Sequence, residues 1–565
     1  MSKNPLNRRE FMRYGAGAAA MAVGNRFAFP PGLLQAAASP MKLSAPRSGP
    51  TLNLVPEKPG KTPSYWCTWG LQNYTLDNAD ENNHSLVANN LTEEQLFGHP
   101  GWVANYFQKA RADLYVLFDL GWDVPPGLQF DRERWRLGTL ELATGKFPSC
   151  TGTPTERLRK LNERTKAAGW RGAGIWVAAQ APGDGRDGKL MDDKVLEAHF
   201  RERARWTRGA GIEYWKVDYG ARGGHPDFRR LVSRIAREEA PGLLVEHGRG
   251  CGPVNDEVVA WENLVANKKG SYRSWDNGRI LQQAVELISF SDVLRTYDVT
   301  AYFSVPTTLD RVAQILAEAA RLRGEPGLVN CEDEPFIAAA LGCAMGVMRH
   351  PLARELKNKP YDPYQVKKRI DEMTRAVRWQ RLAPAVRAGK TKVLLDSNFL
   401  LDHWVFKEGE TWATWLFGRE IVQGAPARVA RGMALPKVKV DGPAPYVIAS
   451  RHPNGAIAVA TLPRISKDKG FYLPLADVAI DIGDGNFPVG VFGRYRTLTL
   501  NLSGKLGARH IWAQDLAGDE AADVTEKVVR AATSITLPGE LINSIGLSAA
   551  TPGDLSEPGL VLQVI

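Results

Sequence analysis

Cysteine is scarce in this chain. Only five cysteines occur in 565 residues, at the widely spaced positions 67, 150, 251, 331 and 343. So few cysteines exclude a disulfide framework, although one bridge could form in an oxidising compartment, and the odd number leaves at least one thiol unpaired. No CxxC pair is present, and the sequence therefore gives no sign of a cysteine zinc site.

Other cofactor signals are also missing. No GxGxxG motif follows a predicted strand, and the glycines at 248–252 lack the helix that a dinucleotide site needs. The acidic run Glu332-Asp333-Glu334 precedes Pro335, which is more typical of a helix N-terminus than of a cation site. We expect no metal and no cofactor.

Long apolar runs are absent beyond the N-terminus, so no transmembrane helix is expected in the mature protein. The N-terminus carries Asn7-Arg8-Arg9-Glu10-Phe11-Met12-Arg13 before a run of small and apolar residues over 14–24, and alanines at 36–38 offer a cleavage region. This pattern resembles a twin-arginine signal peptide over 1–38, followed by a Pro- and Ser-rich linker over 39–62. It predicts export by the Tat machinery to the periplasm or beyond.

The charge is positive but diffuse. Lys and Arg number 72 against 62 Asp and Glu, a formal net charge of +10, with part of the excess in the first 50 residues. No basic stripe is interleaved with aromatic residues, so nucleic acid is not an expected partner. The oligomeric state stays open, while 44% apolar residues are enough for two or three domains.

Strands and helices alternate over residues 63–391. Eight strand candidates lie at 65–69, 114–119, 173–178, 213–218, 243–246, 293–297, 328–331 and near 347. Helical patterns between them cover 155–168, 200–209, 226–240, 280–288 and 309–323, and a long one follows at 363–388. This order predicts a (β/α)8 TIM barrel. Short alternating segments over 392–565 predict an antiparallel β-sandwich domain, whose role is either structural or sugar-binding.

The fourth strand candidate, Glu213-Tyr-Trp-Lys-Val-Asp218, carries the most informative pair. Side chains alternate along a strand, so Lys216 and Asp218 project to the same side. A buried lysine would keep Asp218 ionised, which suits a nucleophile at a strand end but also suits a structural ion pair.

The ends of the other barrel strands also carry aromatic and charged residues, and in TIM barrels the C-terminal strand ends hold the chemistry. These residues are Trp66, Trp69, Asp119, Trp122, Asp123, Trp176, Gln180, Glu246, His247, Arg295 and Asp298. Aromatic faces combined with carboxylates, Lys and Arg suit a pyranose, which stacks its CH face and binds through its hydroxyls.

Five segments in chain order resemble the α-galactosidase (melibiase) superfamily, glycoside hydrolase families 27 and 36. They are Leu117-Phe-Asp-Leu-Gly-Trp122, Gly145-Lys-Phe-Pro148 with Gly174-Ile-Trp176, Tyr214-Trp-Lys-Val-Asp218, Leu294-Arg-Thr-Tyr-Asp298 and Glu325-Pro-Gly-Leu328. The resemblance implies a retaining glycosidase in which Asp218 attacks the anomeric carbon and Asp298 is the acid/base. It implies substrate contacts by Trp69, Asp119, Trp122, Trp176, Lys216, Glu246, His247 and Arg295, and carboxyls about 5–5.5 Å apart.

Two departures from the family pattern keep the identity of the sugar open. Leu120 replaces the second Asp of the strand-two signature, and Asp123 either does or does not substitute for it; Leu294 stands where family 27 usually has Trp. Asp292 is a rival acid, although it precedes strand six and would lie at the wrong end. The expected substrate is an α-galactoside or a close relative, with an α-N-acetylgalactosaminide, a β-L-arabinopyranoside or a non-catalytic carbohydrate-binding barrel as alternatives.

Overall fold

The computed structural model describes residues 52–76, 84–99, 101–248, 278–296, 304–322, 324–348, 363–405, 407, 418 and 420–565. The signal segment 1–38, Cys251 and Asp298 lie outside these ranges. In the described residues no helix is long and apolar enough to cross a membrane.

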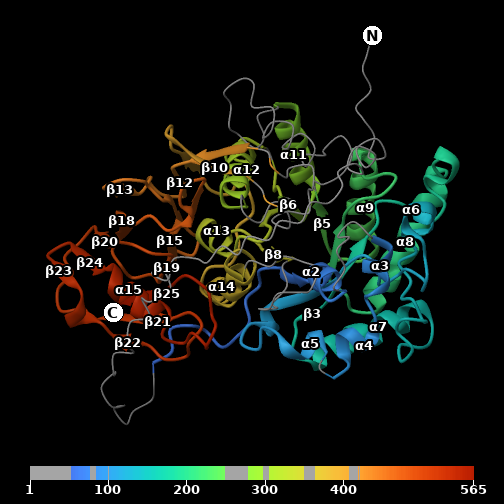
Figure 1. Cartoon of the computed structure of the whole chain (residues 1–565), viewed down its shortest axis with the longest axis horizontal. Helices are drawn as coiled ribbons and strands as arrows, with labels where there is room; N and C mark the ends of the chain where they lie inside the picture. Colours follow the sequence, from blue (N-terminus) through green and yellow to red (C-terminus); the bar gives the residue numbers. More distant parts are fainter. Residues whose placement is uncertain are drawn as a thin grey trace, which may run out of the picture. The chain divides into compact units, whose positions relative to one another are not determined.

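A ring of parallel strands forms the first part of the chain (Figure 1). Its strands are β1 (Ser64–Cys67), β2 (Leu114–Phe118), β3 (Gly172–Val177), β4 (Tyr214–Val217), β5 (Leu244–Gly248), β6 (Val293–Thr296), β7 (Leu328–Cys331) and β8 (Gly346–Val347). Neighbours in sequence pair in order, β1 also pairs with β8, and a bridge between Asn330 and Ala344 completes the ring. The predicted (β/α)8 barrel is confirmed.

Helices separate the barrel strands. They are α2 (Trp69–Tyr74), α3 (His84–Asn89), α4 (Glu93–Phe97), α5 (Trp102–Asn105), α6 (Phe130–Glu133), α7 (Pro154–Ala167), α8 (Asp193–Gly209), α9 (Pro226–Glu239), α11 (Gly278–Phe290), α12 (Ser304–Ala319) and α13 (Pro335–Leu341). The capping box of Thr153 and Glu156 fixes the start of α7. Asp192 caps α8, and this helix therefore begins seven residues before the predicted Phe200.

The barrel interior is built from alternate residues of its strands. Tyr65, Cys67, Tyr115, Leu117, Tyr214 and Val293 form a separate buried cluster, which occupies the inward positions of β1, β2, β4 and β6. The intervening residues, such as Trp66 and Trp215, belong to the outer core shared with the helices. The next inward positions toward the C-terminal strand ends are occupied by polar side chains, and these form the site described below.

The last part of the chain is a β-sandwich, as predicted. Its strands are β9 (Val393–Leu395), β12 (Arg428–Arg431), β13 (Lys437–Lys439), β14 (Tyr446–Arg451), β15 (Ile457–Leu462), β18 (Asp477–Gly483), β19 (Val489–Phe492), β20 (Thr497–Leu502), β21 (Ile511–Asp515), β22 (Ala522–Asp523), β23 (Val529–Ala531), β24 (Ser534–Pro538) and β25 (Gly559–Val564). One sheet has the order β22-β21-β25-β19-β15-β14-β12-β9 and the other β13-β18-β20-β24-β23. An apolar core lies between them. Most pairs are antiparallel, whereas β12–β14, β15–β19 and β18–β20 are parallel.

Smaller elements complete this region: the hairpin β10 (Phe399–Val405) with β11 (Glu420–Pro426), the pair β16 (Arg464–Ser466) with β17 (Gly470–Tyr472), and the helix α15 (Gly539–Gly546).

Two segments connect the barrel to the sandwich. The long helix α14 (Pro363–Leu382) buries Arg375 against Asp515 of β21. Arg375 Nε lies 3.0 Å from Asp515 Oδ1, and Nη2 lies 3.0 Å from Oδ2. The described part of the expected linker is a packed strap over 53–62, in which Leu54 and Val55 are buried. The amide of Leu54 donates to Gln514 Oε1 at 2.6 Å. Both segments therefore fix the sandwich to the barrel.

Candidate active site

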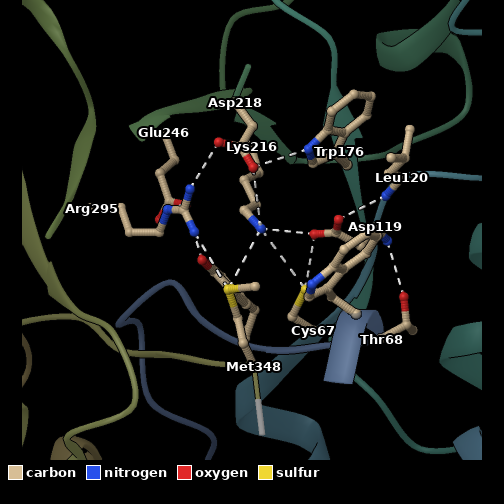
Figure 2. A network of polar contacts seen from close by, with 12 residues as sticks. Cys67, Thr68, Asp119, Leu120, Trp176, Lys216, Asp218, Glu246, Arg295 and Met348 are labelled. Atoms are coloured by element: carbon tan, nitrogen blue, oxygen red, sulfur yellow. Dashed lines mark hydrogen bonds and ion pairs between the residues drawn. The ribbon is translucent and has the colours of Figure 1, made fainter. Parts of the chain in front are cut away.

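Lys216 lies at the centre of a set of polar contacts at the C-terminal end of the barrel (Figure 2). Its Nζ is 2.7 Å from Asp119 Oδ2 and 3.8 Å from Asp218 Oδ2, and the side chain is fully buried. Burial alone would lower the pKa of Lys216, but Asp119, Cys67 and Asp218 together outweigh burial, and the pKa is raised. The amine is therefore a fixed positive charge between two carboxylates.

Asp218 directly follows β4 and is held by three elements. Its Oδ1 accepts from Arg295 Nη2 at 3.0 Å, and its Oδ2 accepts from Trp176 Nε1 at 3.1 Å. From α9, Arg229 donates to its backbone carbonyl at 3.1 Å. Burial raises the pKa of Asp218, whereas the positive charges of Arg295 and Lys216 lower it. The net result is a pKa below the ordinary value of an aspartate. Because 17% of its side chain is exposed, Asp218 is an ionised carboxylate that a ligand can reach.

Arg295, on β6, joins Asp218 to a carboxylate that the sequence analysis did not select. Its Nη1 donates to Glu332 Oε2 at 2.6 Å, and its Nε is 3.8 Å from Glu246 Oε1. Glu332 follows β7 and is only 2% exposed. Burial, against the opposing effect of Arg295, raises the pKa of Glu332 to about 8. We call Asp119, Lys216, Asp218, Glu246, Arg295 and Glu332 the charged cluster.

Glu246 and His247, predicted together as sugar contacts, lie on opposite faces of β5. Glu246 points into the barrel, where it accepts from Tyr65, Tyr214 and Asn330 at 2.7–2.9 Å and is fully buried. His247 points toward α9, and its ring nitrogens contact Arg229 and Ser233. The structure brings Glu246 into the charged cluster beneath Arg295 and leaves His247 outside it.

The other residues predicted to contact the sugar, most of them on β2 and its loop, also fall partly inside and partly outside the charged cluster. Asp119 belongs to the charged cluster. Trp122 is fully buried and donates its indole N–H to the carbonyl of Trp176 at 2.8 Å, so it supports the strand end from behind. Asp123 accepts from the amide of Leu140 at 3.1 Å, and this loop contact gives it no place beside Asp119. Trp69 begins α2 and is half-buried next to His84.

Of the two candidate acids, the structure describes only Asp292. Asp298 lies outside the described residues. Asp292 lies at the start of β6, where its Oδ2 accepts from the amide of Val245 at 3.0 Å and its Oδ1 is 3.8 Å from Arg237. These contacts place Asp292 at the opposite end of the barrel from Asp218. The segment 325–328 also lies at that end, because the amide of Gly327 donates to the carbonyl of Ile288 and that of Leu328 to Asp292.

Several residues of the site were missed, although strand alternation could have found most of them. Cys67 and Tyr65 are the inward residues of β1, and Glu332 follows the inward Asn330 by two positions. Cys67 Sγ donates to Asp119 Oδ2 at 3.0 Å and lies 3.9 Å from Lys216 Nζ. The expectation that the 332–334 run marks a helix N-terminus is confirmed, because α13 begins at Pro335 with Glu334 as its N-cap residue. The Glu334 side chain makes no cap hydrogen bond and instead pairs with Arg369 of α14 at 3.0 Å.

The described residues contain no group of three or more His, Cys, Asp or Glu side chains arranged to hold a metal ion. The positive charges of Lys216 and Arg295 already occupy the space between the carboxylates of the charged cluster.

Comparison with known proteins found only distant structural similarity. No family model matches the chain, and no curated protein matches it. Similar solved structures include a family 27 β-L-arabinopyranosidase from Geobacillus stearothermophilus (12% identity, 89% of this chain and 96% of that chain, TM-score 0.39).

Two further similar structures differ in chemistry. One, provisionally described as an α-N-acetylgalactosaminidase, comes from Bacillus halodurans (12% identity, 66% and 94% covered, TM-score 0.34). The other is an orotidine 5′-phosphate decarboxylase from Lactobacillus acidophilus (10% identity, 56% and 99% covered, TM-score 0.28). A likeness this distant bears on neither substrate nor mechanism.

Proposed function

We propose that this chain is a retaining exo-glycosidase that hydrolyses terminal α-galactosides or a closely related sugar. The observation that carries the proposal is Asp218, a carboxylate held ionised by Arg295 and Lys216 yet 17% exposed at the C-terminal end of a barrel strand. A retaining glycosidase needs such a carboxylate as its nucleophile.

In the proposed mechanism Asp218 attacks the anomeric carbon while the glycosidic bond breaks and its electron pair passes to the leaving oxygen. Asp298 supplies the proton to that oxygen and later removes one from water, which releases the sugar and restores Asp218. Lys216 and Asp119 lie 2.7 Å apart beside the nucleophile and would hold sugar hydroxyls, and Trp176 keeps Asp218 oriented.

A screen of nitrophenyl glycosides tests the proposal. The wild type should hydrolyse at least one of the α-galactoside, the α-N-acetylgalactosaminide and the β-L-arabinopyranoside, and Asp218→Ala should not. A 2-deoxy-2-fluoro glycoside should label Asp218, which mass spectrometry of the peptide would locate. Sugar binding without turnover of any substrate would favour the non-catalytic carbohydrate-binding barrel.

The acid is tested by a matched pair of variants. Asp298→Asn should abolish hydrolysis of glycosides with poor leaving groups, since these need a proton in the first step. Asp292→Asn should retain activity, because Asp292 contacts the amide of Val245 at the other end of the barrel. Loss of activity in Asp292→Asn alone would show the assignment to be wrong.

Leu120 bears on the choice of sugar. It is 2% exposed, and its amide donates to Asp119 Oδ1 at 2.8 Å, while its side chain offers no hydrogen bond. A site that lacks a hydroxyl partner discriminates weakly for that hydroxyl, so a pentose such as β-L-arabinopyranose remains a candidate. In the same screen, Leu120→Asp should shift preference toward the galactoside if Leu120 faces the sugar.

We also propose export through the Tat pathway to the periplasm. The support is the Arg8-Arg9 pair ahead of the apolar run at 14–24. Replacing both arginines with lysine should retain the full-length protein in the cytoplasm, as cell fractionation would show. Unchanged secretion of that variant would contradict this proposal.

A further inference from the structure

The charged cluster is unbalanced. Among the described residues it contains two cations, Lys216 and Arg295, and four carboxyl groups, all of them largely buried. The buried Arg229 adds a third positive charge behind Asp218, so one carboxyl is in excess. Burying a charge without compensation is costly, and a carboxyl in this position takes up a proton instead. The imbalance therefore points to one neutral carboxyl near neutral pH.

The hydrogen bonds indicate which carboxyl this is. Three of them accept two or more hydrogen bonds: Glu246 from Tyr65, Tyr214 and Asn330; Asp119 from Lys216, Cys67 and the amide of Leu120; Asp218 from Arg295 and Trp176. Within the described part of the chain, Glu332 accepts one, from Arg295 at 2.6 Å. It is 2% exposed, so its second oxygen has little access to water.

We propose that Glu332 is the neutral carboxyl of the charged cluster in the free protein, and that it ionises when Asp218 loses its charge. Arg295 connects the two groups, with Nη1 on Glu332 and Nη2 on Asp218. Figure 2 shows its contact with Asp218. While Asp218 is a carboxylate, it shares the guanidinium charge and adds a negative field. Once Asp218 is neutral, that field is gone and the guanidinium favours ionised Glu332.

The other groups around Glu332 keep their charges. Lys216 faces it from β4, Tyr65 from β1 and the neighbouring Asp333 from its own segment. Glu246 reaches it through Arg295. Burial, with a further contribution from Asp333, raises the pKa of Glu332 to about 8, which agrees with a proton held at neutral pH. Among these groups only Asp218 changes charge in the proposed reaction.

The role of this proton in turnover rests on the proposed function. When Asp218 bonds to the anomeric carbon and the glycosidic bond breaks, the aspartate becomes an ester and loses one negative charge. Glu332 then releases its proton to water, which keeps the net charge of the cluster constant. Hydrolysis of the ester restores the carboxylate, and Glu332 takes a proton back. Glu332 acts through Arg295 and is thus a positioning residue.

Protonation of Glu332 can be measured without any glycoside. In protein labelled with ¹³C at the glutamate carboxyls, one NMR signal should titrate near pH 8. This signal should be absent in Glu332→Gln and present in Glu325→Gln, the same change at an exposed residue paired with Lys390. In Asp218→Asn, whose amide imitates the lost charge, the midpoint should fall by about one pH unit or more.

Two results would overturn the proposal: a Glu332 signal already ionised at pH 6, or the same midpoint in Asp218→Asn as in the wild type. If Glu332→Gln does not fold, the shift between wild type and Asp218→Asn still decides the matter. Because no substrate is involved, failure here is distinct from failure of the glycoside screen. If a fluoro glycoside labels Asp218, the labelled enzyme should show the same shift as Asp218→Asn.

Discussion

Arg295 and Arg375 are both fully buried arginines held by carboxylates, yet they build different kinds of site. Arg375 binds both oxygens of Asp515 at 3.0 Å, and the same carboxylate accepts from the amides of Ala517 and Ala549. Both side chains of that pair are 1% exposed. Arg375 Nη1 also pairs with Asp554 Oδ2 at 3.1 Å. Arg295 likewise divides its donors, between Asp218 and Glu332, but its partner Asp218 follows a barrel strand and remains 17% exposed.

The comparison shows that a buried ion pair does not by itself mark a functional site. At Arg375 the donors saturate the carboxylate, and the pair connects α14 to the sandwich. At Arg295 the two bound carboxyls belong to a larger cluster with Lys216, Asp119 and Glu246, and one of them, Asp218, is reached from outside. An unbalanced, partly open cluster at the strand ends is what distinguishes a candidate for chemistry.

The sharpest test of this difference is the same substitution at each site. Asp218→Asn should lower kcat/KM on the best glycoside by at least about 10³-fold, because the nucleophile is gone. Its unfolding free energy should fall slightly, because the lowered pKa of Asp218 means that the folded protein stabilises this charge through Arg295 and Lys216. Asp515→Asn should keep the activity of each folded molecule and lose stability. Steady-state kinetics and urea unfolding of both variants measure the two effects. Equal activity in Asp218→Asn and Asp515→Asn would contradict the difference between a functional and a structural carboxylate.

The arginine of the structural pair gives the next largest effect. Arg375→Ala should lower the unfolding free energy by about 3–5 kcal/mol, because it leaves Asp515 buried without its partner. Arg321→Ala is the control, since this arginine is 78% exposed and its ion pair with Glu318 contributes little. Chemical denaturation compares the two, and a small loss in Arg375→Ala would mean that the junction is not a stabilising contact.

Glu332 predicts a pH dependence with a definite sign. Its pKa is about 8 in the folded protein against an ordinary value of 4.5, so between these pH values the native state binds more protons than the unfolded state. Stability therefore falls as the pH rises through this window, by at most about 1.4 kcal/mol per pH unit.

The variant Glu332→Gln should lose that contribution. Its stability relative to the wild type should rise between pH 5 and pH 8, which unfolding curves at several pH values would show. Parallel curves for the two proteins would indicate that Glu332 is ionised throughout.

The smallest effect is expected at Cys67. Burial raises the pKa of this thiol well above its ordinary value, so iodoacetamide at pH 8 should not alkylate it in the folded protein but should do so after denaturation. Cys67→Ser keeps a donor toward Asp119 and should change the unfolding free energy by less than about 1 kcal/mol. Rapid alkylation in the native state would show that the cluster opens.

Much of this architecture could be predicted from the sequence. The short apolar strands were placed to within a few residues, and Leu328–Cys331 matches β7, because buried strands are bounded by turns and helices. The start of α8 was missed because residues 193–199 mix charged and apolar residues without a clear stripe, while the cap at Asp192 fixes the boundary.

The site was predicted only in part, because it depends on which face of each strand a residue occupies. Lys216, Asp119 and Arg295 were assigned from strand ends, and they meet in the charged cluster. His247 was placed with Glu246 since the strand was expected to end at 246, whereas β5 continues to Gly248 and sends the two side chains to opposite faces. Glu332 was missed because the run before Pro335 was assigned only to a helix start, which is correct. A local pattern does not show that the neighbouring strand β6 brings Arg295 beside Glu332.

The strap at 53–62 has a consequence for how the chain is made. Its hydrogen bond from Leu54 to Gln514 joins positions 460 residues apart, so it cannot form until nearly the whole protein has left the ribosome. A nascent chain that ends before β21 would carry every strand of the barrel and the contacts of Gly60 and Thr62 with it, but Leu54 would lack its partner. Completion of the last domain is then what fixes the start of the strap, and premature stops in the sandwich should yield chains that proteases recognise as unfinished.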